Sequence, residues 1–173
     1  MVTLETGAGV STIFFSKSSP KKHITVVPDK NEIEKIQNHI DSLEIDGNCI
    51  DFRCCSSSSF LPALDEKIDF ALIDGCHGPI IPFIDFYFIA KNLNPNGIII
   101  IDDIQLIAPK ILFEFLKLEG SVEVMFVDDW AAMLKIKDNS FIEKDWWNSG
   151  LNYTAHFDII DSKLLEKAEK FIP

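Results

Sequence analysis

The stretch "LETGAGVST", residues 4–12, has two glycines at the spacing of a turn that approaches a ligand. The preceding "MVTLE" has the pattern of a short strand, and residues 10–18 have that of a helix. Glycine has no Cβ, so Gly7 and Gly9 allow a tight bend and a close approach of the backbone to another molecule. A strand, a glycine turn and a helix in this order indicate the start of an open parallel α/β sheet.

The residues around the glycines restrict which ligand the turn suits. A dinucleotide-binding turn would carry glycine or alanine at position 12, where this sequence has Thr12. Glu5 places negative charge where a pyrophosphate would lie, which disfavours a nicotinamide-dependent oxidoreductase. An acidic residue suits a ligand with an amino group better. The alternative at this point is a tight turn that holds no ligand.

Strand-like and helix-like segments alternate along the rest of the chain. Strand patterns lie at residues 23–28, 49–55, 68–74 and 97–103, and helix patterns at residues 29–43, 82–97 and 108–120. The continuous apolar runs at 68–74 and 97–103 are typical of strands covered on both faces. Residues 122–138 have the pattern of an antiparallel hairpin. We expect an α/β, Rossmann-like, doubly wound fold, with a mostly parallel seven-stranded sheet that ends in this hairpin.

Length and composition fit one globular domain. The chain has 173 residues, of which 47% are hydrophobic and 25% charged. No repeat or interdomain linker is visible, so we expect a single domain over residues 1–173, with a core at about residues 2–137. The tail, residues 138–173, then packs on this core or forms a lid, and the role of Trp146 and Trp147 within it stays open.

Charge and cysteine usage restrict partners and location. The formal net charge of −11 predicts an acidic surface that repels nucleic acid and anionic membranes. The apolar runs are too short to cross a bilayer, and no signal-peptide pattern is present. The four cysteines lack zinc-type spacing and are read as reduced thiols. We therefore expect a cytoplasmic protein that binds neither nucleic acid nor membranes. His23, His39 and His156 have no partner pattern and are expected at the surface.

Four segments in series resemble the class I S-adenosylmethionine-dependent methyltransferases. They are "LETGAGVST", "HITVVPD" (residues 23–29), "IDFALIDGCHG" (68–78) and "LNPNGIIIIDD" (93–103), in the order of that family. The Asp-Gly-x-His and the later acidic pair resemble the macrocin-type and small-molecule O-methyltransferase branch. The resemblance covers about residues 2–137. It implies S-adenosylmethionine as cofactor and methyl transfer to a hydroxyl of a small molecule.

The resemblance also implies which residues contact the cofactor. Matched residue by residue, these are Glu5, Gly7, Gly9, Ser11, Thr12, Cys55, Ser56 and Asp74. The acid that ends the second strand in the family, and holds the ribose hydroxyls, is displaced here. Pro28 occupies its usual position, and Asp29 follows one residue later. Asp29 either reaches the ribose or only caps the next helix.

Asp74, His77, Asp102 and Asp103 follow the ends of two expected strands and form the second candidate group. Carboxylates gathered on one rim repel one another and take up protons unless a cation balances them. Oxygen ligands suit Mg²⁺, which can also bind a substrate hydroxyl and lower its pKa. His77 would accept the proton of that hydroxyl. The resemblance assigns the same roles: Asp74, Asp102 and Asp103 as metal ligands, with His77 and Asp74 as catalytic residues.

Alternatives to this reading stay open. Neighbouring residues on a strand point to opposite faces, so Asp102 and Asp103 both bind a metal only if their strand has already ended. Otherwise one of them caps the helix that begins near Ala108, and Asp74 contacts the cofactor alone. A non-catalytic binding or assembly domain with this fold is the alternative function, favoured by the displaced ribose acid and the start directly at the first strand. The sequence does not identify the methyl acceptor, and a homodimer that completes the pocket is a further alternative.

Overall fold

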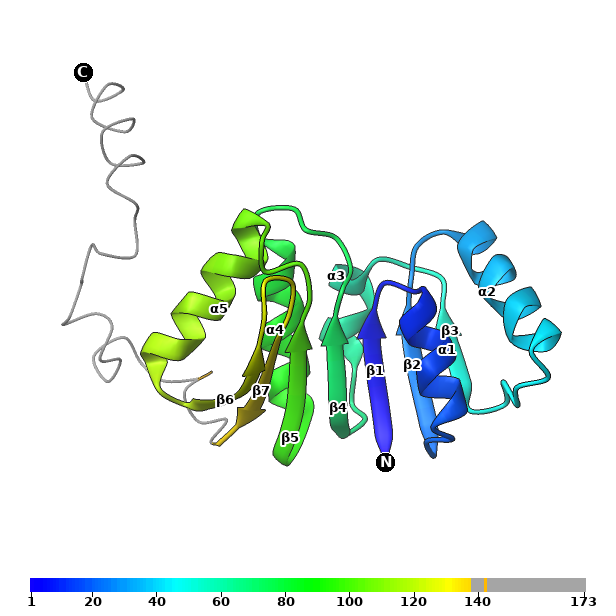
Figure 1. The fold of residues 1–173 in the computed structure, drawn as a ribbon, viewed down its shortest axis with the longest axis horizontal. Helices are drawn as coiled ribbons and strands as arrows, with labels where there is room; N and C mark the ends of the chain where they lie inside the picture. The colour runs from blue at the N-terminus through cyan, green and yellow to red at the C-terminus, as the bar shows by residue number, and fades with distance from the viewer. Residues whose placement is uncertain (138–141, 143–173) are drawn as a thin grey trace, which may run out of the picture.

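The computed structural model describes residues 1–137 and residue 142. Within them a seven-stranded sheet has the order β3-β2-β1-β4-β5-β7-β6 (Figure 1). The strands are β1 (Val2–Thr6), β2 (Lys22–Val26), β3 (Ile50–Arg53), β4 (Ile68–Ile73), β5 (Leu93–Ile101), β6 (Val122–Val127) and β7 (Ala132–Ile136). Strands β1 to β5 are parallel, and β7 runs antiparallel to both β5 and β6. This confirms the expected Rossmann-like α/β fold with an antiparallel terminal hairpin.

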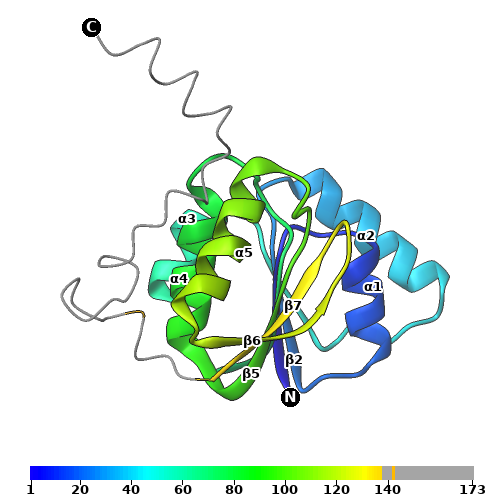
Figure 2. The ribbon, with the colours of Figure 1, turned by 60° about the vertical axis from the view of Figure 1, so that its left-hand side comes forward.

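The helices lie on both sides of this sheet. They are α1 (Val10–Lys17), α2 (Lys30–Ser42), α3 (Ser57–Phe60), α4 (Ile81–Asn92) and α5 (Ile107–Glu119), with a 3₁₀ turn at Leu61–Ala63. Helices α1 and α2 lie on one face, and α3, α4 and α5 lie on the other (Figure 2). None of the helices in the described part of the chain is long and apolar enough to span a membrane. The expected tail, with Trp146 and Trp147, lies almost entirely outside the described residues.

The main core lies between the sheet and the helices α4 and α5. Ala71, Ile99 and Leu134, on three adjacent strands, are completely buried and pack in one cluster with Ile89 and Leu116 of these helices. Burying a leucine or isoleucine side chain contributes roughly 1.5–3 kcal/mol, so this layer contributes strongly to stability. It holds the strand ends of β1, β4 and β5 in a fixed relation.

The opposite face of β4, β5 and β7 is apolar but less covered. Phe70, Ile98, Ile100 and Met133 share this face through the strand registers, and all four are partly exposed. Helix α1 reaches this face at β4, where the ring of Phe15 lies edge to face with the ring of Phe70 at a centroid distance of 5.6 Å. The apolar runs of β4 and β5 predicted strands covered on both faces, whereas Ile98, Ile100 and Met133 on this face of β5 and β7 stay partly exposed within the described residues.

Candidate functional site

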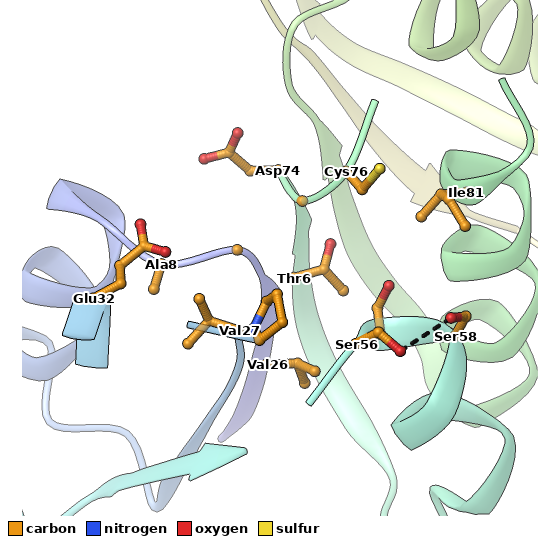
Figure 3. Close-up of a pocket in the computed structure, with 14 residues that line it drawn as sticks. Thr6, Ala8, Val26, Val27, Glu32, Ser56, Ser58, Asp74, Cys76 and Ile81 are labelled. Carbon is orange, nitrogen blue, oxygen red and sulfur yellow. Dashed lines mark hydrogen bonds between the residues drawn. The ribbon is translucent and has the colours of Figure 1, made fainter. Parts of the chain in front are cut away.

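A cavity of about 450 Å³ lies at the carboxyl ends of β1, β2 and β4 (Figure 3). Its lining consists of Thr6, Gly7, Ala8, Val26, Val27, Pro28, Glu32, Ser56, Ser57, Ser58, Asp74, Gly75, Cys76 and Ile81. A volume of this size is typical of small-molecule and cofactor sites, which open parallel sheets place at this edge. The glycine turn therefore borders a ligand-sized cavity, as its sequence predicted.

The expected cofactor residues divide into two groups. Gly7, Ser56 and Asp74 line the cavity. The lining does not include Glu5, Gly9, Ser11, Thr12, Asp29 or Cys55. The spacing of Asp29 and Glu32 predicts a capping box at the start of α2 and gives Glu32 no role at the cofactor. In the structure the Asp29 side chain accepts from the Asn31 N–H, and Glu32 lines the cavity.

Gly7 is required by the geometry of the turn. Its φ of +89° is in the left-handed region, and a Cβ added there would lie 2.2 Å from the carbonyl oxygen of Asp74. Its N–H donates to the carbonyl of Val26 at 2.9 Å, so the turn joins the ends of β1, β2 and β4. Gly9 differs, because its φ is 177° and a Cβ there would meet no atom within 4 Å. The close backbone approach thus depends on the first glycine alone.

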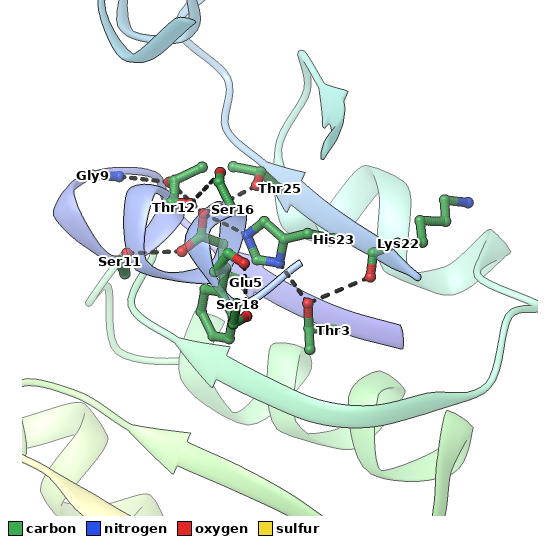
Figure 4. A network of polar contacts seen from close by, with 11 residues as sticks. Thr3, Glu5, Gly9, Ser11, Thr12, Ser16, Ser18, Lys22, His23 and Thr25 are labelled. Atoms are coloured by element: carbon green, nitrogen blue, oxygen red, sulfur yellow. Dashed lines mark hydrogen bonds and ion pairs between the residues drawn. The ribbon is translucent and has the colours of Figure 1, made fainter. Parts of the chain in front are cut away.

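Glu5 lies beside the turn, in a network between β1, β2 and α1 (Figure 4). Its side chain is 1% exposed. Ser11 donates to Oε2 at 2.8 Å, and Thr12 and Thr25 donate to Oε1 at 2.5 and 3.0 Å. Nε2 of His23 lies 3.1 Å from Oε1. Buried carboxylates need such partners, so these contacts hold the carboxylate against α1.

The rest of the network fixes the start of α1. The Gly9 N–H donates to the Thr12 hydroxyl at 3.0 Å, which makes Thr12 a side-chain link within the turn. The ring of His23 stacks on Phe15 with centroids 4.4 Å apart, and its Nδ1 lies 2.8 Å from the Thr3 hydroxyl. The expectation that His23 is a surface residue is wrong, because it is completely buried. The threonine at position 12, which argued against a dinucleotide, has a structural role here.

A second group of side chains lies on the same edge of the sheet. Asp74, His77 and Asp103 each offer one ligand atom, and these atoms lie within 4.8 Å of one another. Nε2 of His77 is 3.3 Å from Oδ2 of Asp103 and makes no hydrogen bond within the described residues. Asp74 belongs both to this group and to the cavity lining.

The acidic pair follows the end of β5, which is Ile101. The alternation of a strand therefore does not apply to Asp102 and Asp103. Asp103 has a left-handed backbone with φ of 54°, and its Oδ1 accepts a hydrogen bond from Gln105 at 2.6 Å. Oδ1 of Asp102 instead accepts from the Asp103 N–H at 2.9 Å, and Asp102 is outside the three-residue group. The structure brings together two of the three expected carboxylates with the histidine.

The surroundings of Asp74 disfavour its negative charge. Burial is the largest cause, followed by the nearby charges of Asp102, Asp103 and Glu5, and together they raise the pKa of Asp74 to about 7. A carboxyl group with this pKa is partly protonated at neutral pH. A cation bound beside it would favour the ionised form, so proton release and cation binding are coupled at this position.

The raised pKa of Asp74 predicts a pH-dependent stability. Its folded pKa exceeds the unfolded value, so the folded state binds more protons between about pH 4 and 7, and stability falls as pH rises through this range. Without divalent cations, Asp74→Asn should therefore be more stable than the wild type at about pH 8, with a smaller difference at about pH 5. Urea unfolding with a chelator at both pH values measures this. A difference that does not change with pH would contradict the raised pKa.

Comparison with known proteins agrees with this geometry. A family model described as a methyltransferase domain matches residues 4–104. No curated protein sequence matches the chain significantly. A similar solved structure is the O-methyltransferase TomG from Streptomyces achromogenes, in complex with SAM, which is 16% identical over 79% of this chain and 73% of that one, with a TM-score of 0.67.

Two further structures share the fold. An O-methyltransferase from Bacillus cereus, in complex with SAH, is 18% identical over 79% of this chain and 74% of that one, with a TM-score of 0.65. A putative methyltransferase from Streptococcus mutans, in complex with SAH, is 14% identical over 78% and 88%, with a TM-score of 0.62. Because the family model covers more than half of the chain and the sheet order agrees, this protein belongs to the class I S-adenosylmethionine-dependent methyltransferase family.

Proposed function

We propose that this protein transfers the methyl group of S-adenosylmethionine to a hydroxyl oxygen of a small molecule. The main observation behind the proposal is that Asp74 connects the two parts of the site. It lines the cavity, and it also belongs to the group with His77 and Asp103. A cofactor in the cavity would then present its methyl group near a base and two carboxylates. The O-methyltransferases among the similar structures support this reaction.

The cofactor would lie along the glycine turn. Its amino-acid end would lie beside Gly7 and Ala8, whose backbone allows close approach, and its adenine beside Ser56 and Ser57. The turn would be held in place by hydrogen bonds outside the cavity, so the residues that form them would affect the cofactor indirectly. They are Glu5, Gly9, Ser11 and Thr12. Cys55, which is partly buried against the core, would support the adenine loop.

The carboxylates fit a divalent cation. Asp74 and Asp103 offer hard oxygen ligands of the kind Mg²⁺ prefers, and Asp102 follows the same strand end and is near enough to raise the pKa of Asp74. We propose Asp74 and Asp103 as its ligands, with Asp102, which lies outside their group in the structure, as a third ligand that would have to turn toward the ion. When bound, Mg²⁺ would lower the pKa of a coordinated substrate hydroxyl.

His77 would be the general base. Its Nε2 is unpaired by hydrogen bonds in the described structure and lies on the same rim as Asp74. In the reaction the acceptor oxygen forms a bond to the methyl carbon, the carbon–sulfur bond breaks, and the hydroxyl proton moves to this nitrogen. The protein thus contributes mainly by placing the nucleophile in line with the methyl group and by holding the proton.

A non-catalytic binding domain is the second candidate. It is favoured by Asp29, whose Oδ1 accepts from the Asn31 N–H at 2.8 Å and caps α2, so that its side chain does not line the cavity. A domain without a ribose ligand would bind the cofactor weakly, and the fold would then act only as a scaffold.

Calorimetric titration with S-adenosylmethionine and with NAD, followed by methyl-transfer assays on small hydroxylated acceptors, separates these functions. We expect binding of S-adenosylmethionine but not of NAD, and transfer that stops with chelator and returns with Mg²⁺. Transfer that survives the chelator would remove the metal from the mechanism. Cofactor binding without transfer to any acceptor would favour the binding domain, and binding of NAD alone would overturn the proposal.

A further inference from the structure

The wall of the cavity beside β2 lacks a polar side chain where a nucleoside would need one. Val26, Val27 and Pro28 line this part of the cavity. In open parallel sheets that bind nucleosides, a carboxylate after the second strand accepts hydrogen bonds from the ribose hydroxyls. The side chains of valine and proline have no atom that can accept these hydrogen bonds. Asp29, the next residue, is exposed and caps α2.

Glu32 supplies a carboxylate to this wall from the first turn of α2. It is partly buried and lines the cavity, and Figure 3 shows its side chain next to Ala8 of the glycine turn. Within the described residues the Glu32 carboxylate forms no hydrogen bond or ion pair. Glu34, on the next turn, forms an ion pair with Lys30, whose Nζ lies 3.6 Å from Oε1 of Glu34. Glu32 is therefore an available acceptor at the edge of the cavity.

We infer that Glu32 binds the two ribose hydroxyls of the cofactor, in place of an acid at the end of β2. Two neighbouring hydroxyls can donate to the two oxygens of one carboxylate, and charge-assisted hydrogen bonds of this kind are stronger than neutral ones. Glu32 reaches the cavity although it lies three residues further along the chain than Asp29, because the helix turns its first-turn side chain back toward the glycine turn. This inference rests on the proposed function, since it needs a nucleoside cofactor in the cavity.

The first measurement compares two matched substitutions in the full chain. Glu32→Gln and Glu34→Gln each remove one negative charge from the same helix, but only Glu32 lines the cavity. By calorimetry, Glu32→Gln should weaken binding of S-adenosylhomocysteine by about 10-fold to 100-fold, the usual effect of losing hydrogen bonds to a charged group. Glu34→Gln should change the affinity for S-adenosylhomocysteine less than about twofold, because the solvent and its salt screen the charge of Glu34 from the ligand. Unfolding curves of both variants control for a loss of structure.

The second measurement identifies the part of the ligand that Glu32 contacts. An analogue of S-adenosylhomocysteine without the two ribose hydroxyls should bind the wild type and Glu32→Gln equally. An unchanged affinity of Glu32→Gln for S-adenosylhomocysteine, or an equal loss for both ligands, would overturn the assignment while the proposed function stands. If the wild type binds neither S-adenosylmethionine nor S-adenosylhomocysteine, the proposed function fails and the assignment fails with it.

Discussion

Replacing Gly7 with alanine is expected to abolish detectable cofactor binding and to lower the free energy of unfolding by about 3 kcal/mol. The new Cβ would lie 2.2 Å from the Asp74 carbonyl oxygen, a backbone atom that cannot move without shifting the end of β4. The φ of +89° adds strain, because residues with a side chain rarely adopt it. Urea unfolding and calorimetry measure the two effects.

Gly9→Ala is the matched control for this prediction. The extended backbone of Gly9 suits any residue, and the space around it is open. Gly9 precedes the first residue of α1, where alanine is a poorer cap than glycine, so a loss of about 1 kcal/mol or less is expected. Cofactor affinity should change little. If Gly7→Ala bound the cofactor as well as Gly9→Ala does, the cavity beside the turn would not be the cofactor site.

His77→Ala should reduce turnover by about 10²-fold to 10⁴-fold, which is the usual contribution of a positioned general base. Cofactor affinity should hardly change, because His77 does not line the cavity and would contact the acceptor hydroxyl instead. Steady-state kinetics at saturating cofactor, together with calorimetric binding of S-adenosylhomocysteine, would separate the two quantities.

His39→Ala provides the control, since His39 is exposed on α2, and its turnover should equal that of the wild type. The pH dependence of kcat adds a second criterion, because the loss of a base should remove the fall in rate at acidic pH. Normal turnover in His77→Ala would show that another group accepts the proton or that the acceptor reacts already ionised.

The order of the elements could be predicted because each strand and helix has its own local pattern. The buried stripe of α2, Ile33, Ile36 and Ile40, recurs at helical spacing, and β4 and β5 each end in four consecutive apolar residues, 70–73 and 98–101. Strand neighbours and registers are different, because they arise from contacts between distant segments. The partly uncovered face of β4, β5 and β7 depends on which helices pack where, and the apolar runs alone did not reveal it.

For Glu5, the alternation along its strand predicts which face the side chain lies on, but not which residues it contacts there. Residues alternate along β1, so Glu5 shares a face with Thr3, and Thr6 points with Leu4 to the other. The register that places Thr25 opposite Glu5 depends on the pairing of β1 with β2 and cannot be derived from either strand alone. The partners of Glu5 therefore became visible only in the folded chain.

The candidate site shows the same limit. The motif after β4 predicted Asp74 and His77 near the later acidic pair, because parallel strands end at one edge of the sheet. The structure groups them with Asp103 but not with Asp102. The sequence could not decide between the two roles of Asp29, and the structure shows it as a helix cap. Nor could it indicate that the side chain of Glu32 lines the cavity, since that depends on how α2 packs beside the glycine turn in the folded chain.

The left-handed backbone of Asp103 restricts how this position can vary during evolution. Among residues with a side chain, aspartate and asparagine adopt a positive φ most readily, and glycine does so freely. Glutamate would keep the charge at the cost of backbone strain, and asparagine would keep the conformation without the charge. Relatives that retain this backbone and an acidic function are therefore expected to retain aspartate itself, whereas lineages that have lost the function can drift to asparagine or glycine.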